Sequence, residues 1–510
     1  MKQRPAIDLE LALAALLSLL LLAVFLAVPF LPMVDLPQHA AQISIWQRLS
    51  DPSSVESAVF ELNLRTPYIG SYVAARLLAP LFGVLPALKV VIWASVVGHF
   101  AAFDLLVRTL GHRRWLSLLG LPLGLGYGFY FGFVSFIGAL PFGLLAISLA
   151  LRQRDAPSIR NGALLALALC ATLATHGFAF GMTSAMIAPL LLRGKGSLVA
   201  RFAPFVVPAL LVVVWLMPGS SGRSIGLTIW DPRLLDLVQI PALWLAASGA
   251  DHLAFLFGCL ILILVLLSLG RPSRMPERYL PLAFMLGAYC LFPLALGGFG
   301  PLHPRFAAFI VPALLLAFEP GVEAERSMLP GLVAATCVAW FGLFVHRLLA
   351  FERETRPIAD FVAGMPAGLS IRPIVFERTS EAFPALPALL HLSAYYVPEK
   401  AGRQGYSFAM YPTSVIRYRA GIIPTMDRGA EWNPDGFSAE AELDQYDCFL
   451  VHSASDRSFQ LFGARASELS LAFHEAGWWA YLGRSARAEW NAHDHSGMVH
   501  DEPLVFSRSQ

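Results

Sequence analysis

Charged residues are scarce in this chain. Asp, Glu, Lys and Arg make up only 14% of its 510 residues, whereas hydrophobic residues make up 56%. Soluble globular domains carry about 25% charged residues, so the composition excludes an ordinary soluble protein of this length. Many of the apolar runs approach the roughly 20 residues that a helix needs to cross a bilayer. The sequence therefore predicts an integral membrane protein.

Motifs that bind nucleotides or nucleic acids are also missing. There is no P-loop, no dinucleotide-binding glycine fingerprint and no basic run with interleaved aromatic residues, and the net charge is only +2. The glycines of Gly124-Leu-Gly126-Tyr-Gly128 lie within an apolar run, where small residues usually serve helix packing. We therefore set nucleic-acid partners aside.

Cysteine and metal motifs give little support for special chemistry. Four of the five cysteines lie in apolar runs, so Cys448 has no partner for a disulfide in the C-terminal region. The tail from Asn491 to Glu502 mixes histidines with acidic residues, namely His493, Asp494, His495, His500, Asp501 and Glu502. Because no spacing such as H-E-x-x-H is present, a solvated loop is favoured over a metal site.

The fold class expected is mainly α, a polytopic transmembrane helix bundle with about 11 spans. The spans are predicted near 8–30, 85–108, 115–132, 134–151, 161–177, 178–193, 202–218, 253–270, 279–297, 306–319 and 328–349. The first apolar run is longer than the roughly 7–15 residues of a signal-peptide core, so we interpret it as a retained span rather than a cleaved signal.

Basic residues alternate between the connections of these spans. Fifteen Lys and Arg residues fall on the side of the N-terminus and seven on the other side. By the positive-inside rule the N-terminus is cytoplasmic, and an odd number of spans places the C-terminus outside. The bundle then occupies residues 1–350, with a long first outer loop at 31–84.

The composition changes after residue 350, where charged residues, Trp, His and Pro become frequent. Residues 351–510 therefore read as a soluble α/β domain outside the membrane. Strands are predicted at 370–376, 446–452 and 478–482, and a helix at 458–476.

The first outer loop holds the most informative residues. Pro37 suits the first turn of a helix, and Asp35, His39, Gln42 and Trp46 recur at spacings of four, three and four, which places them on one face. Ala41, Ile45 and Leu49 form a neighbouring apolar stripe, so we expect the helix to lie on the membrane surface with this stripe down. Asp35 is either the N-cap of this helix or a functional carboxylate.

Other polar residues are expected near the same outer face. They are His39, His176, His252, His303, His346, Asp251, Arg305 and the segment Arg65-Thr-Pro-Tyr68. Ionisable side chains at membrane depth are costly and usually mark a pathway or a site. Their concentration on one side predicts a cavity that opens outward, although each single histidine is more simply an interfacial residue.

On these features the chain resembles the type C glycosyltransferase superfamily, integral-membrane enzymes that use polyprenyl-phosphate-linked sugars. The specific match is Asp35-Leu-Pro-Gln-His39, directly after the first span, where that superfamily keeps its catalytic carboxylate. Many members carry two adjacent acidic residues there, whereas Leu36 follows Asp35. The resemblance thus leaves a divalent metal open and names no metal ligand.

The resemblance implies an inverting sugar transfer to an acceptor hydroxyl at the outer face of the cell inner (plasma) membrane. Asp35 would be the general base, accompanied by His39. The candidates for substrate binding are Arg305, His303, Arg65, Tyr68, His176 and Gln42, with Arg305 holding the lipid phosphate because a guanidinium grips two oxygens at once. The implied partners are the polyprenyl-phosphate sugar donor, membrane lipid, and a glycan, lipid or protein acceptor.

Two other function classes stay open from the residues alone. A transporter or flippase of a lipid-linked substrate would share the polar cavity but should show repeat symmetry and broken helices. No matching halves stand out, although Pro141 and Pro293 interrupt predicted spans. The third class is a non-catalytic membrane scaffold that displays residues 351–510.

Overall fold

The computed structural model describes residues 9–216, 234–296, 300–321, 328–427 and 429–492. The chain forms two compact units. The first combines Met1–Ala27, Leu64–Leu77 and Leu88–Val345, and the second combines Val28–Asn63, Leu78–Ala87 and His346–Gln510.

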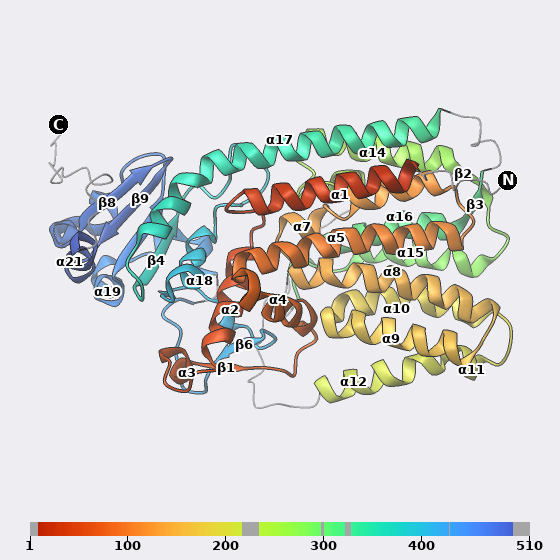
Figure 1. Cartoon of the computed structure of the whole chain (residues 1–510), viewed down its shortest axis with the longest axis horizontal. Coiled ribbons are helices and arrows are strands. Elements are labelled where there is room, and N and C mark those ends of the chain that lie inside the picture. The colour runs from red at the N-terminus through yellow and green to blue at the C-terminus, as the bar shows by residue number, and fades with distance from the viewer. Residues whose placement is uncertain (1–8, 217–233, 297–299, 322–327, 428, 493–510) are drawn as a thin grey trace, which may run out of the picture. The chain divides into compact units, whose positions relative to one another are not determined.

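The first unit is a bundle of apolar helices (Figure 1). Its main elements are α1 (Leu9–Ala27), α5 (Val84–Thr109), α8 (Val134–Asp155), α9 (Ile159–Thr175), α10 (Gly177–Leu192), α12 (Val206–Leu216), α14 (His252–Ser268), α15 (Leu280–Leu291), α16 (Ala307–Ala317) and the start of α17 (Leu329–Gly364). Helix α8 packs against both α9 and α10, and α15 packs against α16 and α10. The fold class is mainly α, as predicted.

Five helical segments of the described residues are long and apolar enough to cross a bilayer. They are Leu9–Ala27, Val84–Thr109, Val134–Asp155, Leu198–Trp215 and Leu329–Gly364. Shorter apolar helices accompany them, among them α4 (Ile69–Phe82), α9, α10 and α14. Length and apolar character together support an integral membrane protein.

The expected span at 115–132 is wrong as a single helix. The segment instead consists of the short turns η1 (Arg114–Leu119), α6 (Gly120–Leu123) and α7 (Tyr127–Tyr130). Gly126 is extended and lies against the backbone of Trp244, where a Cβ atom would come within 2.7 Å of the carbonyl oxygen. The glycines of this segment therefore break the helix to allow a close backbone approach, and hydropathy alone does not reveal that break.

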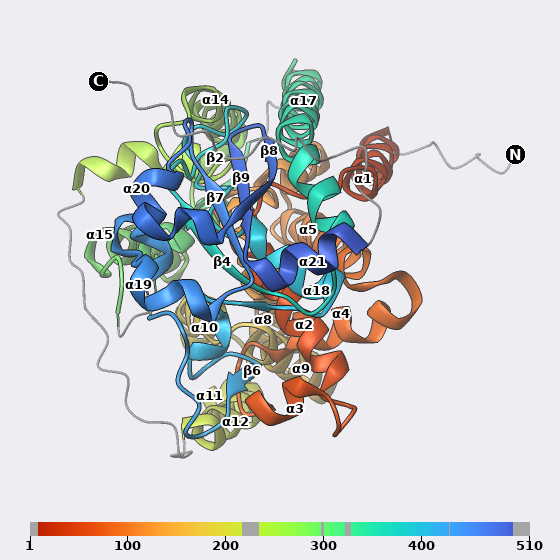
Figure 2. The same cartoon turned by 90° about the vertical axis from the view of Figure 1, so that its left-hand side faces the viewer.

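The second unit contains a five-stranded sheet with the order β5-β4-β7-β9-β8 (Figure 2). Its strands are β4 (Ser370–Val375), β5 (Arg403–Gln404), β7 (Cys448–His452), β8 (Ser470–Glu475) and β9 (Trp478–Leu482). Strand β4 is parallel to β5 and β7, while β9 is antiparallel to β7 and β8. Every residue of β4 and β7 is buried, including Ser370 and Arg372 of β4.

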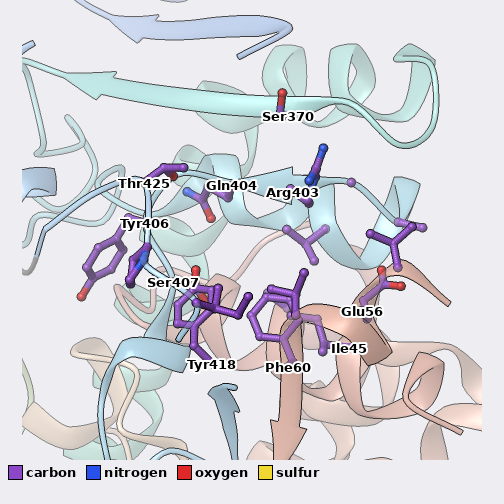
Figure 3. A pocket seen from close by; sticks show the side chains of 18 of the residues that line it. Ile45, Glu56, Phe60, Ser370, Arg403, Gln404, Tyr406, Ser407, Tyr418 and Thr425 are labelled. Atoms are coloured by element: carbon purple, nitrogen blue, oxygen red, sulfur yellow. The ribbon is translucent and has the colours of Figure 1, made fainter. Parts of the chain in front are cut away.

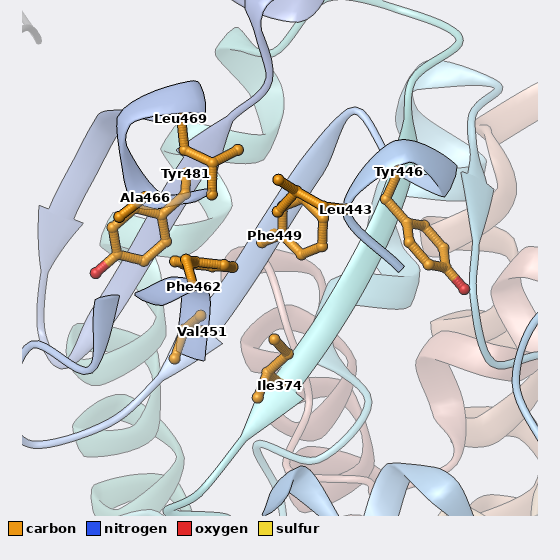
Figure 4. Close-up of a cluster of buried hydrophobic side chains, with 9 residues drawn as sticks. All are labelled: Ile374, Leu443, Tyr446, Phe449, Val451, Phe462, Ala466, Leu469 and Tyr481. Carbon is orange, nitrogen blue, oxygen red and sulfur yellow. The ribbon is translucent and has the colours of Figure 1, made fainter. Parts of the chain in front are cut away.

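One face of this sheet carries an apolar core, shown in Figure 4. Phe449 and Val451 of β7 and Tyr481 of β9 pack there against Phe462 and Leu469 from the segment between β7 and β8. The ring centroids of Phe449 and Phe462 lie 5.4 Å apart in an edge-to-face arrangement, which suits the quadrupoles of two aromatic rings.

The predicted strands at 370–376, 446–452 and 478–482 are confirmed, but the predicted helix at 458–476 is only partly correct. Helix α20 (Ser458–Phe462) ends at Gly463, a 3₁₀ segment follows to Glu468, and β8 begins at Ser470. Ala476 and Gly477 both adopt positive φ and turn β8 directly into β9. Such a two-residue turn matches the twist of a hairpin, and the helical interpretation missed it.

Residues 28–63 belong to the second unit rather than to the helix bundle. Helix α2 (Leu36–Arg48) has Pro37 in its first turn, as predicted. Strand β1 (Phe60–Leu62) pairs antiparallel with β6 (Ile416–Tyr418). Ala41 and Ile45 pack with Phe60, Val397 and Ile416 in a buried cluster.

The apolar stripe of α2 is therefore covered by protein. Our prediction named the wrong partner for this stripe, because periodicity does not show what buries a helix face. The polar residues Gln38 and Gln42 of α2 are buried as well.

Candidate functional site

Asp35 lies immediately before α2, in the N-cap position. Its backbone is helical (φ −90°, ψ −7°), and its side chain makes no capping hydrogen bond to the helix. A capping side chain usually accepts a hydrogen bond from the second or third residue of the helix. The interpretation of Asp35 as a simple cap is therefore not supported, and its carboxylate is directed elsewhere.

His391 lies close to the Asp35 carboxylate. Its Nε2 atom lies 3.9 Å from Oδ1 of Asp35, a separation longer than a hydrogen bond but short enough for electrostatic interaction. The side chain of His391 is only 4% exposed, and that of Asp35 is 19% exposed. The carboxylate thus retains access to solvent, while the imidazole beside it does not.

Burial keeps His391 neutral. Desolvation lowers its pKa from 6.5 to about 3, and the nearby His39 adds to this effect. The imidazole ring stacks on Tyr406 at a centroid distance of 5.3 Å and an angle of 7°. His39, one turn along α2 from Asp35, meets the ring of Phe408 edge to face at 5.6 Å.

Two further groups show that this neighbourhood disfavours added charge. Burial raises the pKa of the Tyr406 phenol well above 10, and the nearby Glu431 adds to the effect. Burial also raises the pKa of the Glu431 carboxyl above 4.5. The charge of a carboxylate in such surroundings is only weakly screened, which strengthens its interaction with a nearby hydroxyl proton.

Gln42 lies on the same helix and is 1% exposed. Neither its side-chain oxygen nor its nitrogen has a hydrogen-bond partner among the residues that the structure describes. A buried amide left in this way costs about 1–3 kcal/mol, so a polar partner is expected there.

A cavity of about 440 Å³ lies within the second unit, between the segment 28–63 and the C-terminal region. Gln38 of α2 lines it. Ile45 of α2, Gln404 of β5, Tyr406 and Tyr418 line it as well (Figure 3). Cavities of roughly 300–1,000 Å³ typically hold small-molecule ligands. Because Tyr406 also stacks on His391, the cavity adjoins the group that neighbours Asp35.

The first unit holds a separate polar cluster around Arg305. Its Nη1 atom lies 3.2 Å from Nε2 of His176, and its Nε atom donates to the carbonyl of Pro301 at 2.9 Å. The guanidinium lies 3.9 Å from the centre of the Phe133 ring, a cation–π contact. Tyr68 meets His176 edge to face at 4.9 Å. Arg305, His176 and Tyr68 therefore come together in the first unit.

Two other candidates of the first unit have contacts of their own. Arg65 donates to the backbone carbonyl of Val214 at 3.1 Å. His303 precedes Arg305 in a short 3₁₀ turn, and its ring meets that of Tyr289 at 5.3 Å. Asp35, His39 and Gln42 belong to the second unit, whereas the remaining candidates belong to the first.

The described residues contain no group of three or more His, Cys, Asp or Glu side chains that could hold a metal ion. The histidine-rich tail at 493–502 lies outside the described residues. All five cysteines are free thiols.

Comparison with solved structures identifies the fold. ArnT from Cupriavidus metallidurans, whose crystal structure contains bound undecaprenyl phosphate, superimposes with a TM-score of 0.53 over 93% of this chain and 97% of that chain. The chain has the type C glycosyltransferase fold. The recognition made from the sequence is therefore confirmed at the level of fold, while the sequence identity of 11% carries no information on individual site residues.

A second similar structure is the arabinofuranosyltransferase AftD from mycobacteria. It matches 94% of this chain but only 40% of its own, with 14% identity and a TM-score of 0.46. That score is too low to establish a shared fold. No protein-family model and no curated protein sequence matches the chain.

Sequence reasoning missed His391, Tyr406 and the cavity. His391 is 356 positions from Asp35 and stands in no recognisable motif. Only covariation between distant positions would have paired the two.

Proposed function

We propose that this protein is a membrane glycosyltransferase that transfers a sugar from a polyprenyl-phosphate donor to an acceptor hydroxyl. The shared fold with ArnT, crystallised with undecaprenyl phosphate, supports a donor of this class. The asymmetry of Lys and Arg between alternate connections supports a cytoplasmic N-terminus. The proposal places the active face outside the inner (plasma) membrane, with a glycan, lipid or protein acceptor on that side.

The observation that carries the chemistry is the carboxylate of Asp35. It does not cap α2, remains partly exposed and lies beside a neutral, buried imidazole. In the proposed reaction Asp35 accepts the proton of the acceptor hydroxyl as the oxygen attacks the anomeric carbon. The bond from that carbon to the phosphate oxygen breaks with its electron pair, and the configuration inverts.

His391 is proposed as a positioning residue in this arrangement. Because its pKa of about 3 keeps the ring neutral, it does not neutralise the Asp35 carboxylate. His39 and Gln42, on the same face of α2, are proposed to contact the acceptor. This role would give the buried Gln42 amide the partner that it lacks among the described residues.

Arg305 is proposed to hold the donor phosphate. Its guanidinium is held by Pro301 and faces His176, and a planar fork of N–H donors matches phosphate oxygens. Tyr68, His176, His303 and Arg65 complete the proposed donor side. The negative charge that develops on the leaving phosphate would be stabilised by Arg305. No step is assigned to a metal.

The test uses purified protein in lipid vesicles and a polyprenyl-phosphate donor with a labelled sugar. Asp35→Asn keeps the shape of the side chain but removes its basicity, so we expect turnover to fall roughly 10²- to 10⁴-fold. Asp51→Asn is the matched control, because Asp51 is an exposed aspartate of the same segment, bonded to Ser53.

Near-parent turnover in the Asp35 variant would contradict the assignment. The same assay separates the other function classes. A transporter would move the donor without breaking its sugar–phosphate bond, and a scaffold would do neither.

A further inference from the structure

The cavity of the second unit has two chemically different walls (Figure 3). One wall is mainly apolar and carries Ile45, Phe60 and Tyr418, from α2, β1 and β6, with Glu56 at its edge. The opposite wall is polar and carries Arg403, Gln404 and Thr425. All of these residues lie within one compact unit, so the cavity does not depend on how the two units are arranged.

The apolar wall contains an aromatic platform. The rings of Phe60 and Tyr418 lie 5.0 Å apart, tilted by 34°, and are held there by the pairing of β1 with β6. Phe60 is 8% exposed and packs in the cluster with Ala41 and Ile45. An aromatic ring on a rigid support is suited to stacking against the C–H face of a sugar ring.

The polar wall is preorganised. The Gln404 side chain accepts a hydrogen bond from the Gln38 amide at 3.2 Å and donates to the hydroxyl of Ser393 at 2.7 Å. A glutamine amide has two N–H donors and two acceptor lone pairs, so these bonds leave capacity for a ligand while fixing the orientation of the group. Arg403, exposed on the edge strand β5, adds a cationic donor.

These features separate a saccharide from an acyl chain. An acyl chain would satisfy the apolar wall but would cover Gln404, Arg403 and Thr425 without forming hydrogen bonds, and each polar group covered in this way costs free energy. A sugar ring presents an apolar C–H face and a rim of hydroxyls, and so matches both walls at once. We propose that this cavity is a saccharide-binding subsite.

The position of the subsite suggests its role. Gln38 lines the cavity three residues after Asp35 on the same helix, and Tyr406 lines it while stacking on His391. Resting on the proposed function, the subsite binds a sugar unit of the acceptor near the hydroxyl that Asp35 deprotonates. The acceptor is accordingly a glycan or glycoconjugate rather than a plain lipid or peptide.

The experiment measures binding of a disaccharide panel (gluco-, manno-, galacto- and arabino-configured) to the full-length protein in nanodiscs, without donor, by saturation-transfer NMR. We expect at least one disaccharide to bind. Arg403→Ala and Tyr418→Leu should each weaken its affinity roughly fivefold to tenfold, the effect of losing one ordinary hydrogen bond or a contact of similar strength. The matched controls, exposed Arg487→Ala and Trp432→Leu in the same unit but outside the cavity lining, should bind like the parent.

Arg403 is exposed, so its variant tests the inference even if Tyr418→Leu fails to fold. The inference is overturned if no disaccharide binds or if the cavity variants bind disaccharide like the controls. It is also overturned if decanoate binds at a site that depends on Tyr418 and no sugar competes with it there. Because the donor is absent, loss of turnover in Asp35→Asn is an independent result. If the protein transfers sugar in an Asp35-dependent way but both cavity variants bind sugar like the parent, only this inference fails. If the cavity variants weaken sugar binding but the protein transfers no sugar, only the proposed function fails.

Discussion

The buried imidazole of His391 predicts a sensitivity to acid that one substitution should remove. Its pKa falls from 6.5 to about 3 in the folded protein, mainly because burial penalises the charged ring. Between about pH 3 and pH 6.5, His391 therefore binds a proton in the unfolded chain but not in the folded one. The contribution of His391 to stability is therefore constant above pH 6.5 and decreases by about 1.4 kcal/mol for each pH unit below it, down to about pH 3.

The substitution His391→Phe keeps a flat ring against Tyr406 but cannot take up a proton. We expect the parent to lose about 2 kcal/mol more than the variant when the pH falls from about 7 to about 5. The assay is urea unfolding of the protein in nanodiscs, monitored by hydrogen exchange in the peptide 446–452, which contains β7. The difference between the two proteins cancels the contributions of other buried groups such as Glu431 and His452.

Identical pH dependence in the parent and the His391→Phe variant would refute this reasoning. It would mean that the imidazole is already solvated, or that it becomes protonated without loss of packing. The proposed role of His391 as a neutral neighbour of Asp35 would then fail as well.

Two further predictions concern the first unit and the orientation of the chain. Arg305→Lys loses the planar contact with Phe133 and one of the bonds to Pro301 and His176, so the free energy of unfolding should fall by about 2–4 kcal/mol and turnover should fall with it. The control substitution Arg160→Lys, at an exposed arginine, should change neither quantity. An unchanged thermal midpoint for the Arg305 variant would contradict this prediction. A reporter fused after residue 360 should be active only if it functions outside the cytoplasm, as the distribution of Lys and Arg predicts. Activity of a cytoplasm-dependent reporter there would reverse the proposed topology.

Several elements were predictable because their signals are local. The apolar runs of α1 and α5, the position of Pro37 in the first turn of α2 and the buried strands β4 and β7 all follow from residues close together in sequence. The break at Gly126 and the hairpin turn at Ala476–Gly477 were missed. There the deciding factor is a close backbone approach or a positive φ angle, which hydropathy does not report.

The candidate site divides in the same way. Asp35 was identified because it follows an apolar span and opens a helix with a polar face, and both features can be read within fifteen residues of it. His391 and Gln404 contribute to the same neighbourhood only because residues 28–63 pack with the C-terminal region. Tertiary pairing over such distances has no signature in a single sequence.

The pairing of β1 with β6 has a consequence for the order in which the protein is made. Glu61 and Arg417 form an ion pair at 2.8 Å across these strands although they are 356 positions apart. During synthesis the apolar side chains of Ala41, Ile45 and Phe60 stay exposed until their partners in the C-terminal region, such as Ile416, have left the ribosome. Contacts of such long range form late and leave aggregation-prone surface exposed in the meantime. A nonsense mutation that removes the last hundred residues would remove β6, leave the apolar surface of residues 28–63 exposed, and so make the truncated protein a target of quality-control proteolysis.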